Sequence, residues 1–193
     1  MTGTILRAAD RVAQPWKNGG GTTREVIAAP SSGASGDFDW RVSMAEVAVA
    51  GPFSSFPGID RTLKVLEGAL ALTFTDPHAE HVLTPQTPAL DFPGDVAVTG
   101  RPLDGPVLDL NLMVRRGAFR GSIEDHLAGT IPAIPDILAV LMLIALRPTT
   151  AWIGEVRHEL AHHDALHLSP AGHVAPLRVD GPVLVLRVAS CGV

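Results

Sequence analysis

The sequence predicts an all-β protein of many short strands, folded as one domain or as two small, closely packed ones. Its 193 residues include 19 glycines and 16 prolines, which favour many turns and short strands over long helices. Several segments alternate apolar and polar residues, which is the period of a β-strand. The second half repeats the strand–turn–strand rhythm of the first, without a residue-level repeat that would prove duplication. We therefore expect the chain to divide into a first half, residues 1–117, and a second half, residues 118–193.

Composition and net charge limit which binding partners and which cellular compartment are expected. The net charge of −5 argues against nucleic acid or an anionic membrane as a partner. A single cysteine, Cys191, excludes an intrachain disulfide and fits a reducing cytoplasm. The first residues lack the apolar stretch of a signal peptide. Residues 137–146 form the longest apolar run, which is too short to span a bilayer and is expected to be a buried strand.

The first polar segment, residues 15–25, follows a short strand expected at residues 4–6 and reads PWKNGGGTTRE. Three consecutive glycines exclude a helix or a strand interior and permit close backbone approach. Successive backbone N–H groups in such a loop can form an anion-binding nest, and Lys17 and Asn18 stand beside it. It is not a phosphate-binding P-loop, because the lysine precedes the glycines. The alternative is a tight turn with Lys17 in solvent.

Residues 40–47, WRVSMAEV, alternate as a strand should. Trp40, Val42 and Met44 share one face, which is apolar. The other face carries Arg41 and Ser43, which would join a cavity if that face lines one. The alternative for Arg41 is a solvent-facing position.

The central stretch, residues 51–68, has the spacing of a metal-binding cupin motif without its metal ligands. In cupin barrels, two histidines one residue apart are followed by a glutamate and, six residues later, a glycine. Here Ser54 and Phe56 take the histidine positions, Arg61 takes the glutamate position, and Gly68 is retained. Ser, Phe and Arg cannot form a site for a divalent cation. A guanidinium suits an anion instead, so we expect no metal and no cofactor here.

The remainder of the first barrel continues with a strand at residues 69–74 and a polar hairpin end at residues 76–87. The turn FPGD, residues 92–95, resembles that of a second cupin motif, but no histidine follows it. Residues 107–114, VLDLNLMV, place Asp109, Asn111 and Met113 on one face and leucines on the other. These polar side chains are either solvated or aimed into a polar pocket.

The second half has weaker signals. Residues 119–135 show little regular pattern, and strands are expected at residues 137–146, 151–156, 165–168 and 183–188. Residues 158–162, HELAH, match the H-E-x-x-H zinc motif, which requires a helix. The match is short, the following residues resemble a strand, and the longer pattern with a glycine and a third histidine is absent. We interpret it as a histidine-rich hairpin end, with a zinc hydrolase as the alternative.

Five stretches in this order, PWKNGGGTTRE, WRVSMAEV, GPFSSFPGIDRTLKVLEG, FPGD and DLNLM, resemble the HutD/Ves family over residues 5–115. The resemblance implies a metal-free bicupin, with two jelly-roll-type barrels in one chain. HutD members are associated with histidine utilisation genes, Ves members are named for a stress response, and no secure enzymatic activity belongs to the family name. The family positions present here are Trp16, Lys17, Asn18, Gly19, Gly20, Thr22, Arg41, Ser43, Phe53, Ser54, Phe56, Arg61, Asp109 and Asn111.

The hypothesis is a cytoplasmic protein that binds a small carboxylate in its first barrel, with urocanate or formate suggested by the resemblance alone. Arg61 and Arg41 would pair with the carboxylate, and Lys17 with the glycine loop would close the mouth. Asp109 would orient an arginine. Ser43, Ser54 and Asn111 would supply hydrogen bonds, and Trp16, Phe53 and Phe56 an apolar wall.

Two other classes of function stay open. A metal-independent isomerase or lyase would use Lys17 or Asp109 for proton transfer, although the pocket motifs hold no histidine and the chain has no tyrosine. An interaction protein with a vestigial pocket is the third class. Edge strands of such barrels often pair between copies, which makes a homodimer one expected assembly.

Overall fold

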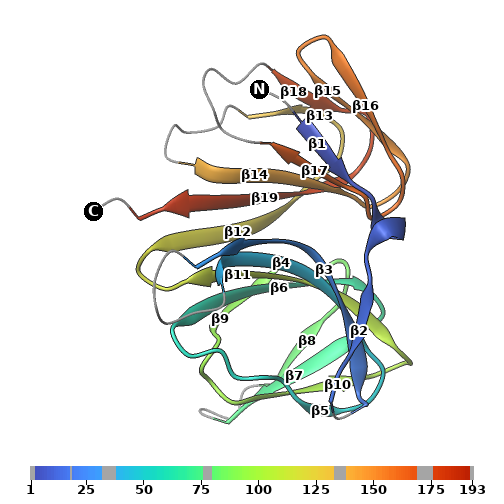
Figure 1. Ribbon diagram of the computed structural model, residues 1–193. Helices are drawn as coiled ribbons and strands as arrows, with labels where there is room; N and C mark the ends of the chain where they lie inside the picture. The colour runs from blue at the N-terminus through green and yellow to red at the C-terminus, as the bar shows by residue number, and fades with distance from the viewer. Residues whose placement is uncertain are drawn as a thin grey trace. The chain divides into compact units, whose positions relative to one another are not determined.

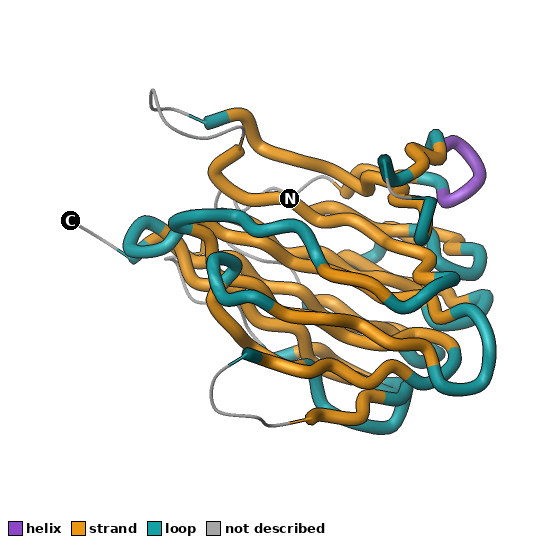
Figure 2. Tube along the Cα trace, turned by 90° about the horizontal axis from the view of Figure 1, so that it is seen from below, coloured by secondary structure: helices purple, strands orange, loops and turns teal. Residues whose placement is uncertain are grey.

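The computed structural model describes residues 3–17, 19–31, 38–75, 80–132, 138–168 and 176–191. Over these residues the regular structure is β-strand apart from one short 3-10 turn at Ala8–Asp10, so the all-β prediction is confirmed (Figure 2). No helix in these ranges has the length and apolar character needed to cross a membrane. The chain forms two compact units: Val12–Gly117, and Met1–Arg11 together with Ala118–Val193.

The first unit contains two antiparallel sheets (Figure 1). The six-stranded sheet has the order β2 (Ala13–Pro15), β3 (Gly21–Pro30), β4 (Phe38–Val47), β11 (Val107–Arg115), β6 (Ile59–Glu67) and β9 (Leu90–Pro93). The four-stranded sheet has the order β5 (Gly51–Pro52), β10 (Val98–Pro102), β7 (Leu70–Phe74) and β8 (Glu80–Leu83).

The apolar core of the first unit joins its two sheets. Leu63 and Val65 of β6 pack in one cluster with Leu70 and Leu72 of β7, and all four are almost fully buried. These residues follow the strand period, because every second side chain of each strand points toward the other sheet. The core therefore fills one part of the space between the sheets and leaves the neighbouring part to the polar residues described below.

The register of the central strands brings distant residues together. Asn111 of β11 lies opposite Ser43 of β4 and opposite Leu63 of β6. Met113 lies opposite Arg61 of β6 in the same way. Since side chains alternate between faces, Arg41 and Ser43 share one face of this sheet with Asp109 and Asn111, as the sequence predicted.

The second unit also contains two antiparallel sheets. One has the order β1 (Gly3–Leu6), β17 (Ala165–Leu168), β14 (Leu138–Ala145), β19 (Val183–Ser190) and β12 (Phe119–His126). The other has the order β13 (Gly129–Ile131), β18 (Leu177–Val179), β15 (Thr149–Ile153) and β16 (Val156–Leu160). Leu143, Leu166 and Val185 of the first sheet and Ile153 and Leu177 of the second meet in one core cluster.

Two expectations for this unit need correction. Residues 119–135, expected to show little regular structure, contain β12 and β13, whose polar sequences form strands because they pair with β19 and β18. Residues 1–11, expected in the first unit, belong to the second, because β1 pairs with β17. The apolar run was interpreted correctly and forms the buried strand β14.

The HELAH segment does not form the helix that its zinc motif requires. His158 lies on β16, which pairs with β15 in a hairpin, and His162 lies in the turn after it. The two histidines therefore do not share a helix face. In the first unit, the expected polar hairpin end contains β8 with the exposed His81, while His78 lies outside the described residues.

Candidate functional site

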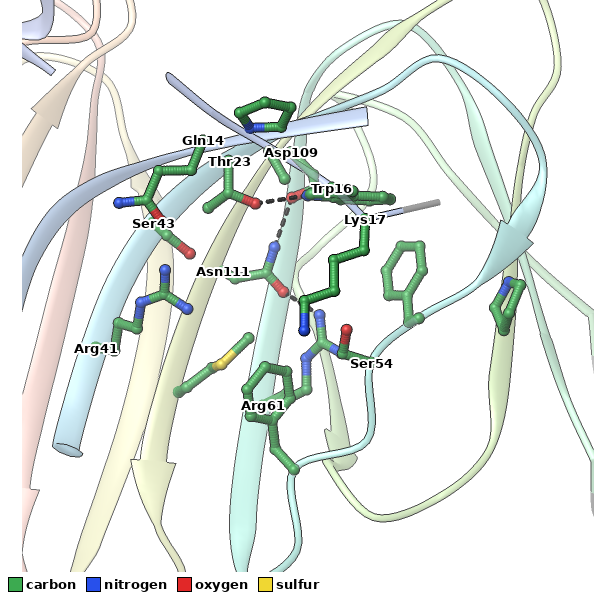
Figure 3. Close-up of a pocket in the computed structure, with 16 residues that line it drawn as sticks. Gln14, Trp16, Lys17, Thr23, Arg41, Ser43, Ser54, Arg61, Asp109 and Asn111 are labelled. Carbon is green, nitrogen blue, oxygen red and sulfur yellow. Dashed lines mark hydrogen bonds between the residues drawn. The ribbon is translucent and has the colours of Figure 1, made fainter. Parts of the chain in front are cut away.

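A cavity of about 510 Å³ opens in the first unit, between its two sheets and the segments that lead into them (Figure 3). This volume lies within the range of small-molecule sites, about 300 to 1,000 Å³. The side chains come from the β2 region, from β3, β4, β6 and β11, and from the loop between β5 and β6. The lining residues are Gln14, Pro15, Trp16, Lys17, Thr23, Arg41, Ser43, Ala45, Pro52, Phe53, Ser54, Phe56, Arg61, Asp109, Asn111 and Met113.

Ten of the twelve residues expected at the site line this cavity, and one described residue, Thr22, does not. Asn18 lies outside the described residues. Thr22 is not among the lining residues, and Thr23 takes its place, with its Oγ1 accepting a hydrogen bond of 2.8 Å from Trp16 Nε1. Neighbouring residues of a strand point to opposite faces, and Thr23 is the one paired with the lining residue Ala45.

Other lining residues were missed by the sequence reasoning. Ala45 and Met113 share a strand face with Ser43 and Asn111, so the alternation already contained the signal that could have found them. Gln14 and Pro15 had no such signal, because the short β2 becomes a wall of the cavity only through its pairing with β3.

Arg61 is a buried cation held among aromatic rings. Its side chain is 5% exposed, and its guanidinium carbon lies 5.2, 5.8 and 5.0 Å from the ring centres of Phe53, Phe56 and Phe92. Nη2 donates a 2.5 Å hydrogen bond to Asn111 Oδ1, while Nε has no hydrogen-bond partner among the described residues. Burial lowers the pKa of Arg61 to about 10, against the attraction of Asp109, so the group stays charged at neutral pH.

Asp109 is fully buried behind Asn111. Its Oδ1 accepts a 2.5 Å hydrogen bond from Asn111 Nδ2, and its Oδ2 has no partner among the described residues. Burial raises the pKa of Asp109 to about 7, although the charge of Arg61 and hydrogen bonds from Asn111 and the Ala45 backbone oppose the rise. Asn111 therefore separates the carboxyl from the guanidinium, with its oxygen toward Arg61 and its amide nitrogen toward Asp109 (Figure 3).

Two further cations reach the cavity. Arg41 Nε is paired with Glu25 Oε2 at 2.9 Å, so its charge is already offset by a carboxylate. Lys17 is exposed, and its side chain extends toward the region where Arg61 and Ser54 point (Figure 3). Arg61 is thus the most deeply buried cation of the cavity wall, and the structure gives it a neutral amide as its direct partner.

The apolar wall is held by the loop between β5 and β6. Trp16 and Phe53 meet edge to face, with ring centres 6.2 Å apart. Phe53 N donates to Val98 O at 3.0 Å, and Phe56 N donates to Gly94 O at 2.8 Å. A Cβ on Gly100 would lie 2.4 Å from the Phe53 ring, so this glycine makes room for the aromatic wall. Sequence reasoning did not identify this supporting role.

The donor set of the cavity does not fit a divalent metal. Among the described lining residues, Asp109 is the single carboxylate, and none is a histidine or cysteine. One buried carboxyl beside a guanidinium is a poor ligand set for the cations that proteins commonly bind. The lining instead combines a buried cation, neutral polar groups and aromatic rings, which suits a small organic anion.

A family model described as HutD matches residues 8–185 of the chain. The chain belongs to the HutD family. An uncharacterized 21.2 kDa protein in the hutC 3′ region of Pseudomonas putida is 30% identical over 187 residues, covering 96% of this chain and 97% of the relative. Protein Ves of Citrobacter koseri is 37% identical over 110 residues, which is 56% of either chain. The resemblance to the HutD/Ves family is therefore confirmed, and the HutD match extends into the second unit.

Solved structures support the same relationship. The HutD structure from Pseudomonas fluorescens SBW25, described as a formate condition, has a TM-score of 0.84 and 27% identity, covering 99% of this chain and 100% of that one. A cupin 2 conserved barrel domain protein from Leptotrichia buccalis has a TM-score of 0.53 at 7% identity, covering 87% of this chain and 88% of that one. The likeness to the cupin domain concerns the fold alone, and it indicates that the fold of this chain is cupin-like.

Proposed function

We propose that this HutD-family protein binds a small carboxylate in the cavity of its first unit and acts in the regulation of histidine utilisation. The observation that carries the binding proposal is Arg61, a cation buried in a cavity wall with a neutral amide as its direct partner. A buried charge without a charged hydrogen-bond partner is costly, and a carboxylate placed against the guanidinium would offset that cost. The relative in the hutC 3′ region supports the link to histidine utilisation, and the likeness to Ves supports a stress response as a second setting.

In this proposal, each group of lining residues has a role in binding the carboxylate. Arg61 would bind the carboxylate, and Lys17 at the exposed side would strengthen the attraction. Ser43 and Ser54 would donate neutral hydrogen bonds, and the rings of Phe53 and Phe56 would enclose the apolar part of the ligand. We assign Arg41 a supporting electrostatic role, since Glu25 already holds its guanidinium.

For the fold we propose a bicupin, in which each unit is a small jelly-roll barrel. Two antiparallel sheets over one apolar core in each unit support this, as does the fold likeness to a cupin barrel domain. The cavity would then occupy the position at which metal-binding cupins hold their ion.

The test is calorimetric titration of the protein with formate and with urocanate, using Arg61→Met against the control Arg101→Met. Arg101 lies on β10 in the same unit, is exposed and does not line the cavity. Hydrogen bonds to charged groups contribute about 1.5 to 3 kcal/mol, so Arg61→Met should weaken binding by about 10- to 150-fold. Arg101→Met should bind like the wild type.

A neutral ligand provides a test that needs no variant. The amide of the same acid keeps its shape and loses its charge, so it should bind far more weakly than the acid to the wild-type protein. Equal affinity of acid and amide, or full affinity in Arg61→Met, would overturn the assignment of Arg61. If no acid binds, the remaining class of function is an interaction protein whose pocket is vestigial.

A second candidate function is a metal-independent isomerase or lyase, and the observation that favours it is Asp109. A buried carboxyl that changes protonation near neutral pH is a candidate acid–base group. Proton NMR of urocanate incubated with the protein separates the two functions, because a binding protein returns the acid unchanged and an enzyme converts it.

A further inference from the structure

The buried charges of the cavity do not balance once an anion enters. In the free protein, Arg61 and Asp109 face each other across Asn111, with 2.5 Å hydrogen bonds on either side of its amide group. A carboxylate bound to Arg61 becomes a second negative group beside the same guanidinium. Two acidic groups sharing one buried cation cannot both remain ionised at low cost, because a buried, low-dielectric site screens their repulsion only weakly.

We propose that the cavity takes up a monocarboxylate together with one proton from solvent, and that Asp109 Oδ2 holds this proton. The inference rests on the proposed function and deepens it by naming the ligand class and a linked ion. When Asp109 becomes neutral, Arg61 pairs with the ligand carboxylate alone. Where Asp109 is ionised in the free protein, above a pH of about 7, the net charge of the buried region then stays the same before and after binding.

Among the described residues that line the cavity, Asp109 is the single acidic group, and Glu25, which pairs with Arg41, does not line it. The described charged groups facing the cavity are Arg61 from β6, Arg41 from β4 and Lys17 from the segment before β3. The lining residue from β3 is Thr23, which is not ionisable. Asp109 Oδ2 is buried without a hydrogen-bond partner among the described residues, so a proton there displaces no existing bond.

The direction of the pH dependence follows from this arrangement. Burial sets the pKa of Asp109 at about 7, so above that pH the free protein holds a carboxylate that must be protonated when the ligand binds. A neighbouring anion raises this pKa further. Affinity should therefore be level below pH 7 and fall with rising pH above it, approaching about tenfold for each pH unit.

The ligand class follows from the same count of charges. A monocarboxylate with an apolar body places its charge on Arg61 and its body against Phe53 and Phe56. A dicarboxylate brings a second charge, for which the cavity offers only the exposed Lys17 and the already paired Arg41. Benzoate should therefore bind more tightly than phthalate, which has the same ring and one more carboxylate.

The experiment is calorimetric titration of the protein with formate and benzoate at pH 6 and pH 8, each in two buffers with different enthalpies of ionisation. Neither acid titrates in this range, so the difference between buffers counts protons taken up by the protein. We expect nearly one proton at pH 8 and a small fraction at pH 6, where Asp109 already holds its proton. Asp109→Asn should take up none and show no pH-dependent affinity, while Asp104→Asn, an exposed control, should follow the wild type.

The outcomes separate this inference from the proposed function. If no acid binds at either pH, the proposed function fails and the inference fails with it. Binding with no proton uptake at pH 8 overturns the inference alone. Unchanged uptake in Asp109→Asn assigns the proton to another group. If Asp109→Asn does not fold, the wild-type proton counts at pH 6 and pH 8 decide whether binding takes up a proton. Phthalate is titrated beside benzoate at pH 8, and tighter binding of phthalate overturns the ligand class.

Discussion

Replacing Asp109 by asparagine should change how the stability of the free protein depends on pH. The carboxyl has an ordinary pKa of 3.8, and burial raises it to about 7 in the folded protein. Because the folded value lies above the unfolded one, folding favours the protonated form. Its contribution to stability is fully present below pH 3.8 and is lost as the pH rises through about 7.

The size of this effect follows from the linkage relation. One pKa unit corresponds to about 1.4 kcal/mol, so between pH 5 and pH 8 the wild type should lose about 3 kcal/mol through this group. Asparagine cannot titrate, so Asp109→Asn does not undergo this loss. The free energy of unfolding of the wild type, measured relative to the variant, should therefore fall by about 3 kcal/mol over this pH range. Titrating groups common to both proteins cancel in the comparison.

The assay is urea unfolding of both proteins at pH 5, 6, 7 and 8 in buffers without carboxylates. Asp104→Asn is the control, because Asp104 is exposed and its variant should run parallel to the wild type. Parallel profiles of wild type and Asp109→Asn would refute the reasoning. They would mean that Asp109 keeps an ordinary pKa, so that Arg61 and Asn111 offset its burial completely.

Three further changes probe the wall, the second core and the N-terminal strand. Gly100→Ala places a Cβ 2.4 Å from the Phe53 ring. We expect the free energy of unfolding in urea to fall by about 1 to 3 kcal/mol and carboxylate binding to weaken in calorimetry. Unchanged values would show that the ring is not confined. Leu143→Ala removes a fully buried side chain from the core of the second unit. The free energy of unfolding in urea should fall by about 2 to 5 kcal/mol, while carboxylate affinity stays intact. A fall of less than about 1 kcal/mol would contradict the packing. Asp164→Ala leaves two backbone N–H groups without their acceptor and should speed amide exchange in β1, whereas unchanged exchange would mean that β17 alone holds this strand.

The alternation within strands was readable from the sequence because it depends only on neighbouring residues. The pattern of residues 107–114 placed Asp109 and Asn111 on one face, and that face lines the cavity. The expectation that Ser54, Phe56 and Arg61 stand where metal-binding cupins carry their ligands likewise came from spacing alone. Thr22 was expected at the site from the family resemblance, and the structure places Thr23 in the cavity wall instead. Two adjacent threonines give no apolar contrast from which the sequence alone could assign a face.

Which strands pair is a different kind of information. The assignment of β1 to the second unit and of β2 to the cavity wall depends on partners far along the chain, and no local pattern names those partners. The polar segment that forms β12 shows the same limit, since pairing with β19 makes it a strand.

The sequence by itself determined the all-β class and the faces of the central strands, and it predicted an anion-binding arginine at Arg61. The tertiary structure decided which charges meet: it paired Arg41 with Glu25 and put Asn111 between Arg61 and Asp109. The physical reason is that alternation is a property of one strand, whereas burial and hydrogen bonding depend on the register between strands. The pKa of Asp109, and with it the proposed proton uptake, arises only when that register is formed.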